Sequence, residues 1–151
     1  MALHVSKKGL DLPVTGAPEQ VIESGSTPRR VALLADDYLG LKPTFLVQAG
    51  DTVRRGQALF EDKKTPGVRF TSPCSGTVTA INRGERRAFQ SVVIEVNPGN
   101  DEQVSFQAFT GATPATYDRA GAQALLVEAG LWPALRTRPF SRVPALDTKP
   151  Y

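Results

Sequence analysis

The chain has 151 residues, of which 40% are hydrophobic and 22% charged, a composition typical of one folded domain or of one domain with part of a second. Its single cysteine, Cys74, and its single histidine, His4, exclude an internal disulfide, a cysteine-rich iron–sulfur site and a zinc site built from several histidines. The net charge is only +3, and the acid-free segment 131–144 with its three arginines accounts for it, so a broad basic surface for nucleic acid is not expected.

The N-terminal residues 1–30 are rich in glycine and proline, and they are predicted to form an irregular segment that packs on the core. A short apolar run from Val31 to Leu34 follows. Because the run is short and bounded by turn residues, it indicates a buried strand rather than a helix.

Residues 45–96 alternate between short apolar stretches and turn signals. The alternation and the β-branched residues predict strands at 45–47, 53, 58–60, 68–71, 77–81 and 91–96, with a hairpin loop over 82–90. Gly50 and Gly56 permit left-handed turns, and the Asp51 side chain is expected to bond backbone groups within its turn. Strands at this spacing are typical of a small barrel or sandwich.

The sequence predicts one helix, over residues 115–131. Thr116 is the expected N-cap, ahead of an acid in the first turn, where the helix dipole favours negative charge. Gly130 suits the position just past the helix end, and Pro114 and Pro133 confine the helix on both sides. A basic tail that contains several prolines follows the helix.

Two strings in the middle of the chain resemble the biotinyl/lipoyl type of barrel-sandwich hybrid. They are V-x-x-G-D-x-V-x-x-G-x-x-L over residues 47–59 and S-P-x-S-G-x-V over residues 72–78. Within the second string, Pro73 and Gly76 are expected to bend one strand between two layers. The residues therefore predict a mainly β fold of that type.

The same resemblance raises the question of a modified lysine. In lipoyl domains a lysine at a hairpin tip carries the swinging arm, and Asp62-Lys63-Lys64 occupies the comparable place here. The loop is longer than a carrier tip, and no methionine flanks the lysine as it does in biotin carriers. Because a motif needs its context, Lys63 is predicted to be an unmodified, solvated hairpin lysine.

A longer resemblance covers most of the chain. Its strings are KKGLDLPVTGAPEQVI (7–22), VALLADDYLGLKPTFLVQAGDTVRRGQALFEDKKTPGVRFTSPCSGTV (31–78), NRGERRAFQSVVIEV (82–96) and GLWPALRTRPFSRVP (130–144). They resemble the A subunit of the bacterial Na⁺-translocating NADH:quinone reductase. Members of that family are much longer, so the chain is expected to be an N-terminal fragment.

The resemblance implies a peripheral subunit on the cytoplasmic side of the bacterial inner membrane. The complex passes electrons from NADH to ubiquinone and exports Na⁺, and the NADH and flavin sites lie in other subunits. Ubiquinone is implied as a ligand of the full-length protein, and the other subunits of the membrane complex are implied as partners. No run approaches the ~20 apolar residues of a transmembrane helix, so no direct membrane span is expected.

The segment after the predicted helix indicates why a flavin site is not expected. The fold of this family is similar to the flavin-binding subunit of respiratory complex I, in which a glycine-rich loop after a helix wraps the flavin phosphate. The matching segment here, Leu131 to Phe140, contains no glycine. Prolines and a tryptophan in that segment oppose close approach of backbone N–H groups to phosphate. The chain is therefore expected to bind no flavin, nicotinamide, metal or iron–sulfur cluster, and it contains no catalytic constellation.

Two short regions are candidates for contact with quinone or a partner. Tryptophan and arginine are enriched at interface hot spots, which singles out the tail, and an acidic turn after the first strand could position a quinone oxygen. The candidate residues are Trp132, Arg136, Arg138, Phe140, Asp37 and Tyr38. The alternatives are that the tail anchors the chain on a further domain and that the acidic turn is an ordinary surface turn. Cys74 is expected to be an inert thiol.

Taken together, the sequence predicts a mainly β (α+β) chain with three parts. These are an N-terminal segment (1–30), a barrel-sandwich hybrid domain (31–112), and a helix with a basic tail that starts a truncated α/β domain (113–151). The fragment alone is not expected to be catalytic, although it is part of an enzyme complex. Alternatives are an acyl- or biotin-carrier domain, a scaffold module without a redox role, and the related N-terminal domain of an electron-transport complex subunit.

Overall fold

The computed structural model describes residues 15–99, 101–111 and 116–149, and these form seven strands and one α-helix with short 3₁₀ turns between them. The strands are β1 (Arg30–Leu34), β2 (Pro43–Phe45), β3 (Thr52–Val53), β4 (Ala58–Asp62), β5 (Arg69–Thr71), β6 (Gly76–Arg83) and β7 (Phe89–Val96). The helix is α1 (Arg119–Glu128), and 3₁₀ turns occupy Ala35–Asp37, Glu85–Arg87 and Trp132–Ala134.

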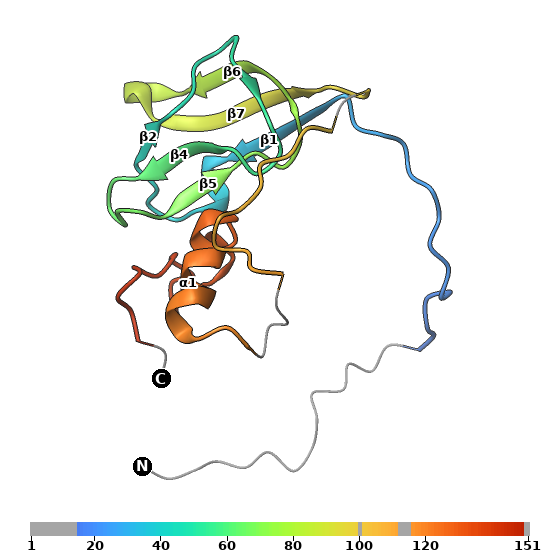
Figure 1. The fold of residues 1–151 in the computed structure, drawn as a ribbon. Helices are drawn as coiled ribbons and strands as arrows, with labels where there is room; N and C mark the ends of the chain where they lie inside the picture. The colour runs from blue at the N-terminus through green and yellow to red at the C-terminus, as the bar shows by residue number, and fades with distance from the viewer. Residues whose placement is uncertain (1–14, 100, 112–115, 150–151) are drawn as a thin grey trace.

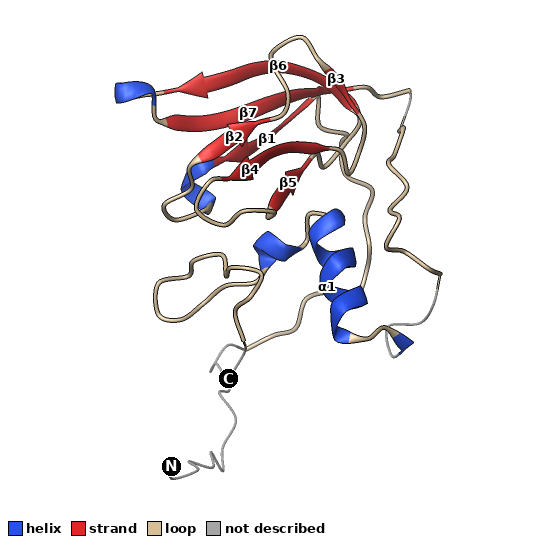
Figure 2. Cartoon of the chain, turned by 60° about the vertical axis from the view of Figure 1, so that its left-hand side comes forward, coloured by secondary structure: helices blue, strands red, loops and turns tan. Residues whose placement is uncertain are grey.

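The strands form two antiparallel sheets, one in the order β1-β7-β6-β3 and the other in the order β2-β4-β5. The two sheets face each other, and helix α1 lies beyond β5, on the far side of the smaller sheet (Figure 2). The prediction of a mainly β barrel-sandwich fold with a single C-terminal helix is therefore confirmed.

The core lies between the sheets and extends toward the helix. Leu59 and Phe60 on β4 are both fully buried, although consecutive strand residues point to opposite faces. Phe60 stacks on Phe70 with ring centres 4.7 Å apart. The buried cluster includes Trp132 from the C-terminal segment, with Leu126 of α1 packed against it. The helix and tail are thus part of one continuous core with the strands.

The turn residues behave as predicted. Gly50 and Gly56 have φ of +97° and +82°, in the range that favours glycine. The Asp51 carboxylate accepts the N–H of Gln48 at 2.9 Å within its turn. The chain passes from one sheet to the other between β5 and β6, where a Cβ on Gly76 would overlap the carbonyl oxygen of Glu95.

Strand limits differ slightly from those predicted. The strand expected at 45–47 is β2, which begins at Pro43 and pairs Phe45 with Phe60. A proline can begin this strand because β2 lies at the edge of its sheet, where an N–H is not needed. The hairpin loop expected over 82–90 is present but shorter, because β6 extends to Arg83 and β7 begins at Phe89; Arg86 and Arg87 in it have φ of 51° and 61°.

The N-terminal segment does not pack on the core over the described part. Residues 15–30 are all exposed, and up to the start of β1 they run away from the sheets as the blue trace of Figure 1. The irregular character of this segment is as expected, but its apolar side chains do not reach the core; Ile22, for example, is fully exposed. Residues 1–14, including His4, lie outside the described residues.

Helix α1 is shorter than predicted, and Thr116 is not its N-cap. Asp118 caps the helix instead, because its carboxylate accepts the N–H of Gly121 at 2.7 Å. The end is as predicted: Gly130 has φ of +69° and donates to Val127, while Leu131 donates to Leu126. A Cβ on Gly130 would overlap Thr71, so the helix end rests directly on β5.

Candidate functional site

The tail after α1 is held by Trp132. This side chain is only 8% exposed, and its indole N–H donates to the carbonyl oxygen of Pro144 at 2.9 Å. Gln123 of α1 donates to the carbonyl oxygen of Leu146 at 2.9 Å, a second tie between helix and tail. Trp132 is therefore an anchor of the fold over the described residues, and only a small part of its side chain is exposed.

Between these ties the tail forms a small loop that projects outward. Thr137 clamps it by donating its N–H and its hydroxyl to the carbonyl oxygen of Arg142, at 2.8 and 3.1 Å. Arg138 and Phe140 lie in the tip and are exposed, Phe140 to 66%. The two side chains are thus exposed over the described residues, and their contact with a ligand or partner stays a prediction.

Arg136 connects this loop to the acidic turn after β1. Its guanidinium carbon lies 4.9 Å from the centre of the Tyr38 ring, and Tyr38 packs edge-on against Phe70 with ring centres 4.7 Å apart. Burial raises the pKa of the Tyr38 phenol; the Arg136 charge opposes this shift and the Asp37 charge adds to it. The structure therefore brings together Asp37, Tyr38 and Arg136, which the sequence had singled out in separate regions.

A groove of about 790 Å³ runs between α1 and the tail. Its apolar surface comes from residues such as Leu126, Trp132 and Leu135, and four cationic side chains line it without a carboxylate among the lining residues. The cations are Arg119, Arg136, Arg138 and Lys149. Such a groove suits a ligand or segment that combines an apolar body with hydrogen-bond acceptors or negative charge. Asp37, Tyr38 and Phe140 do not line it.

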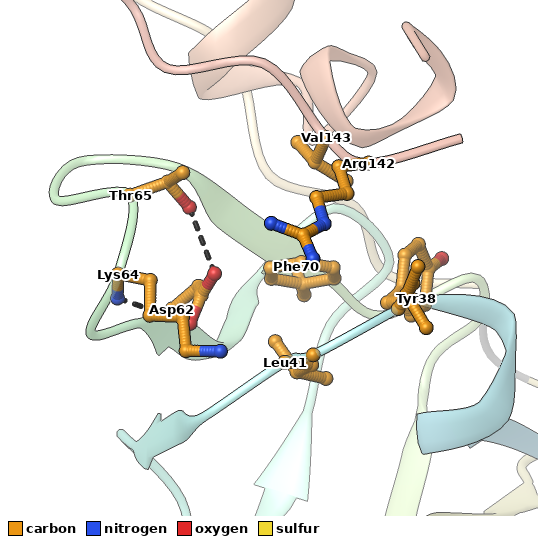
Figure 3. Close-up of a pocket in the computed structure, with 10 residues that line it drawn as sticks. Tyr38, Leu41, Asp62, Lys64, Thr65, Phe70, Arg142 and Val143 are labelled. Carbon is orange, nitrogen blue, oxygen red and sulfur yellow. Dashed lines mark hydrogen bonds between the residues drawn. The ribbon is translucent and has the colours of Figure 1, made fainter. Parts of the chain in front are cut away.

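A second, smaller cavity of about 180 Å³ lies beside Tyr38, between the sandwich and the tail (Figure 3). Its lining comes from three chain segments: Tyr38, Leu39, Gly40 and Leu41; Asp62, Lys64 and Thr65 with Phe70; and Arg142 and Val143. Sequence reasoning did not select Lys64, Phe70 or Arg142 as site residues. No local pattern could have done so, because the cavity exists only where the three segments meet.

The Asp-Lys-Lys motif has a structural role in this loop. The Asp62 side chain is buried, and its carboxylate accepts hydrogen bonds from the Lys42 N–H, the Lys64 N–H and the Thr65 hydroxyl at 3.0–3.1 Å. Lys63 is exposed and is held through its backbone, whose N–H donates to the carbonyl oxygen of Lys42 at 2.9 Å. The aspartate thus shapes the turn that presents the two lysines.

Cys74 is half-buried, and its carbonyl oxygen accepts the Ser72 hydroxyl at 2.7 Å. Burial raises the pKa of its thiol, the Asp101 charge adds to that shift, and the Ser72 hydroxyl opposes it. A raised pKa keeps the sulfur in its less nucleophilic thiol form. This agrees with the inert thiol expected from the sequence.

The described part of the chain has neither a cluster of metal ligands nor a helix suited to a membrane. Among residues 15–99, 101–111 and 116–149, no group of three or more His, Cys, Asp and Glu side chains is placed to hold a metal ion. Within the same ranges, no helix has the length and apolar character needed to cross a membrane.

Comparison with known families decides the relationship. The family model described as the NqrA N-terminal barrel-sandwich hybrid domain matches residues 5–97, more than half of the chain. The chain belongs to the NqrA family. A second model, the NqrA second alpha/beta domain, matches residues 117–151, which contain α1 and the basic tail.

Curated relatives of the NqrA family agree with this assignment. The A subunit of the Na(+)-translocating NADH-quinone reductase of Vibrio anguillarum is 55% identical over 142 residues, which are 94% of this chain and 31% of that protein. The proteins of the same name from Serratia proteamaculans and Saccharophagus degradans are 55% and 57% identical over 144 residues, 95% of this chain and 32% of each protein. The chain therefore spans about a third of the length of these relatives.

The candidate site lies where the two NqrA domain matches meet. Tyr38 and Phe70 belong to the stretch matched by the first model, whereas Arg136 and Arg142 belong to the stretch matched by the second. The contact between Arg136 and Tyr38 thus joins the barrel-sandwich domain to the beginning of the next NqrA domain. Residues from both matched stretches line the small cavity, whereas the residues that line the groove all belong to the second stretch.

Proposed function

We propose that the chain works as part of the NqrA subunit of a Na⁺-translocating NADH:quinone reductase, on the cytoplasmic face of a bacterial inner membrane. The relatives that share 55–57% of its residues carry the name of that subunit. In this proposal the complex oxidises NADH, reduces ubiquinone and exports Na⁺, and this part of the NqrA subunit holds no redox cofactor of its own.

The proposed role of the chain is to contact the quinone or a neighbouring subunit through the junction of its two domains. The observation that carries this role is the placement of Arg136, which lines the basic groove and at the same time covers the Tyr38 ring at 4.9 Å. A guanidinium donates to carbonyl or carboxylate oxygens, and aromatic side chains pack on a flat ring. Arg138 and Phe140 add an exposed cation and an exposed ring at the loop tip.

Trp132 anchors the loop that carries Arg136 and Arg138. Its buried indole, bonded to Pro144, fixes the two ends of the loop that carries Arg136 and Arg138. A contact surface held in this way loses less conformational entropy when a ligand or partner binds.

The role is tested with the double variant Arg136→Ala/Arg138→Ala, made in the full-length protein and studied within the complex. We expect impaired assembly of the complex or slower reduction of ubiquinone, with the β core still folded by circular dichroism. The matched control is Arg29→Ala/Arg54→Ala, which removes two exposed arginines outside the groove. If the groove variant assembles and reduces quinone at the wild-type rate, the loop is only a connector and the proposed role is wrong.

The cofactor-free character has its own test, the visible absorption spectrum of the purified chain. The segment that follows α1 has no glycine between Leu131 and Phe140, and Trp132 and Pro133 in it are buried. Backbone N–H groups there cannot form the open anion-binding loop that a flavin phosphate needs. We expect no absorption band in the visible range; a stoichiometric flavin band would contradict the proposal.

A further inference from the structure

The small cavity beside Tyr38 has two cationic side chains at its edge and an apolar surface within. In Figure 3, Arg142 enters from the tail and extends toward the ring of Phe70, while Lys64 enters from the β4–β5 loop on the opposite side. A Cβ on Gly40 would come within 3.1 Å of the Lys64 ammonium nitrogen, which places that nitrogen against the Gly40 backbone in the cavity wall. The two cations thus approach one space from two domains.

Neither cation is neutralised by a carboxylate over the described residues. The ion pairs found there are Arg55 with Asp101 and Arg69 with Glu61. The one acid in the cavity lining is Asp62, and its two oxygens already accept three hydrogen bonds from the loop that it shapes. The lining therefore carries two cations against one carboxylate, and the side-chain donors of Lys64 and Arg142 are available to an anion.

Apart from Thr65, the rest of the lining is mainly apolar. Phe70 is 2% exposed and is held between the rings of Phe60 and Tyr38, each with its centre 4.7 Å away. Leu41 and Val143 complete this surface, and both pack against the hydrophobic core. Such a surface favours a ligand with an apolar body over a bare, strongly hydrated oxyanion.

The position of Arg142 is set by the tail loop. Its carbonyl oxygen accepts two hydrogen bonds from Thr137, and its guanidinium carbon lies 5.9 Å from the centre of the Phe140 ring. The backbone at Arg142 is thus fixed before any ligand arrives, which reduces the entropy lost on binding.

The geometry points to a binding site for a small organic carboxylate, whose charged end lies between Lys64 and Arg142 and whose compact apolar body packs on Phe70. The volume of about 180 Å³ is below the ~300–1,000 Å³ of pockets for drug-sized ligands, so the ligand is limited to about one ring or one short branched chain. This inference does not rest on the proposed role in quinone reduction, because it concerns the isolated chain and residues outside the groove.

Binding is tested by calorimetric titration of the chain with benzoate, which has one carboxylate and one ring. Benzamide serves as the neutral analogue of the same shape, and inorganic phosphate as the anion without an apolar body. We expect saturable binding of benzoate, with benzamide and phosphate each at least about tenfold weaker, because each lacks one of the two interactions. Equal binding of benzamide or of phosphate would overturn the inference, as would the absence of saturable benzoate binding.

Variants in neighbouring residues then locate the site. Lys64→Gln and Arg142→Gln are each expected to weaken benzoate binding about tenfold, since each removes a charged donor. The matched controls are Lys63→Gln, in the same loop as Lys64, and Arg54→Gln, an exposed arginine that lines neither the cavity nor the groove. Lys64→Arg, which keeps the charge, should retain most of the affinity. If Lys63→Gln and Lys64→Gln have the same effect, benzoate does not bind in this cavity and the inference is wrong.

Discussion

The guanidinium of Arg136 covers the ring of Tyr38 at 4.9 Å, although the two residues lie near opposite ends of the described chain. Tyr38 follows the first strand of the barrel-sandwich domain, and Arg136 lies in the tail beyond its helix. A contact of this kind contributes ~0.5–1 kcal/mol at an exposed site. The contact matters because of where it lies. It joins the two NqrA domains, and Tyr38 lines the small cavity while Arg136 lines the groove.

The first prediction concerns the titration of Tyr38. The charge of Arg136 favours the phenolate, so Arg136→Ala should raise the pKa of Tyr38 further above its ordinary value. Ultraviolet absorbance across alkaline pH measures the change, and Tyr38→Phe identifies which of the 3 tyrosines is responsible. Arg138→Ala, which leaves the contact intact, should not move the titration. A Tyr38 pKa that falls or stays the same in Arg136→Ala would show that the contact is not formed in solution.

The second prediction concerns the close approach of the helix end to β5. Gly130→Ala should destabilise the chain for two reasons: alanine at φ of +69° costs ~1–2 kcal/mol, and its methyl group would overlap Thr71, for which overpacking adds ~1–3 kcal/mol. Gly50→Ala is the matched control, because Gly50 also has positive φ but has no atom within 4 Å of an added Cβ. Urea unfolding compares the two variants. Equal losses of stability would mean that the helix end is not held against β5.

The third prediction concerns pH. The carboxylate of Glu128 accepts the N–H groups of Ala108 and Gln107 at 2.7 and 2.8 Å, and these bonds lower its pKa below the usual value. A lowered pKa in the folded state stabilises the fold above the unfolded pKa, and this contribution is lost as the pH falls through the folded pKa. Glu128→Gln should therefore be less stable than the parent chain at neutral pH, and the difference should shrink as the solution becomes acidic.

The measurement is the denaturation midpoint of both chains from neutral pH to below the ordinary range of glutamate. Glu95→Gln, a change at an exposed glutamate on β7, controls for the loss of one negative charge. A difference between parent and Glu128→Gln that stays constant over this pH range would contradict the assigned hydrogen bonds.

The fourth prediction concerns the anchor of the tail. Trp132→Ala should cost ~3–5 kcal/mol, as large-to-small changes at buried aromatic residues do, and should free the loop to which Arg136 belongs. Trypsin should then cut after Arg136 and Arg142 faster than in the parent chain; Arg138 precedes Pro139 and is not a trypsin site. Leu131→Ala is the control, since the neighbouring leucine is 56% exposed. Unchanged cleavage in Trp132→Ala would mean that Trp132 does not hold the tail.

The fifth prediction is that Lys63 and Lys64 carry no lipoyl or biotinyl group. The loop that presents them is fixed by Asp62, and the Lys64 ammonium lies in a cavity wall beside Gly40. Peptide mass spectrometry of the protein from its native host should show Lys63 and Lys64 with unmodified masses. An added lipoyl or biotinyl mass would restore the carrier interpretation.

Local chemistry was enough to predict most of the barrel-sandwich. Alternation identified the strands, the two glycines at positive φ marked the turns, and Gly130 marked the helix end, because each of these depends on a few neighbouring residues. The helix start was assigned wrongly: Thr116 and Asp118 are both good N-caps, and only the hydrogen bond from Gly121 decides between them.

The candidate site depended on the tertiary structure. The sequence by itself selected Tyr38, Asp37, Arg136 and Arg138 from residue type and local charge, and the long resemblance determined the family. It could not show that Arg136 meets Tyr38, that Trp132 is buried, or that Lys64 and Arg142 share a cavity. Those relationships join residues far apart along the chain, and they form only when the helix end rests on β5 and the tail closes against the sandwich. The sequence thus determined which residues have the chemistry, and packing between distant segments decided which of them act together.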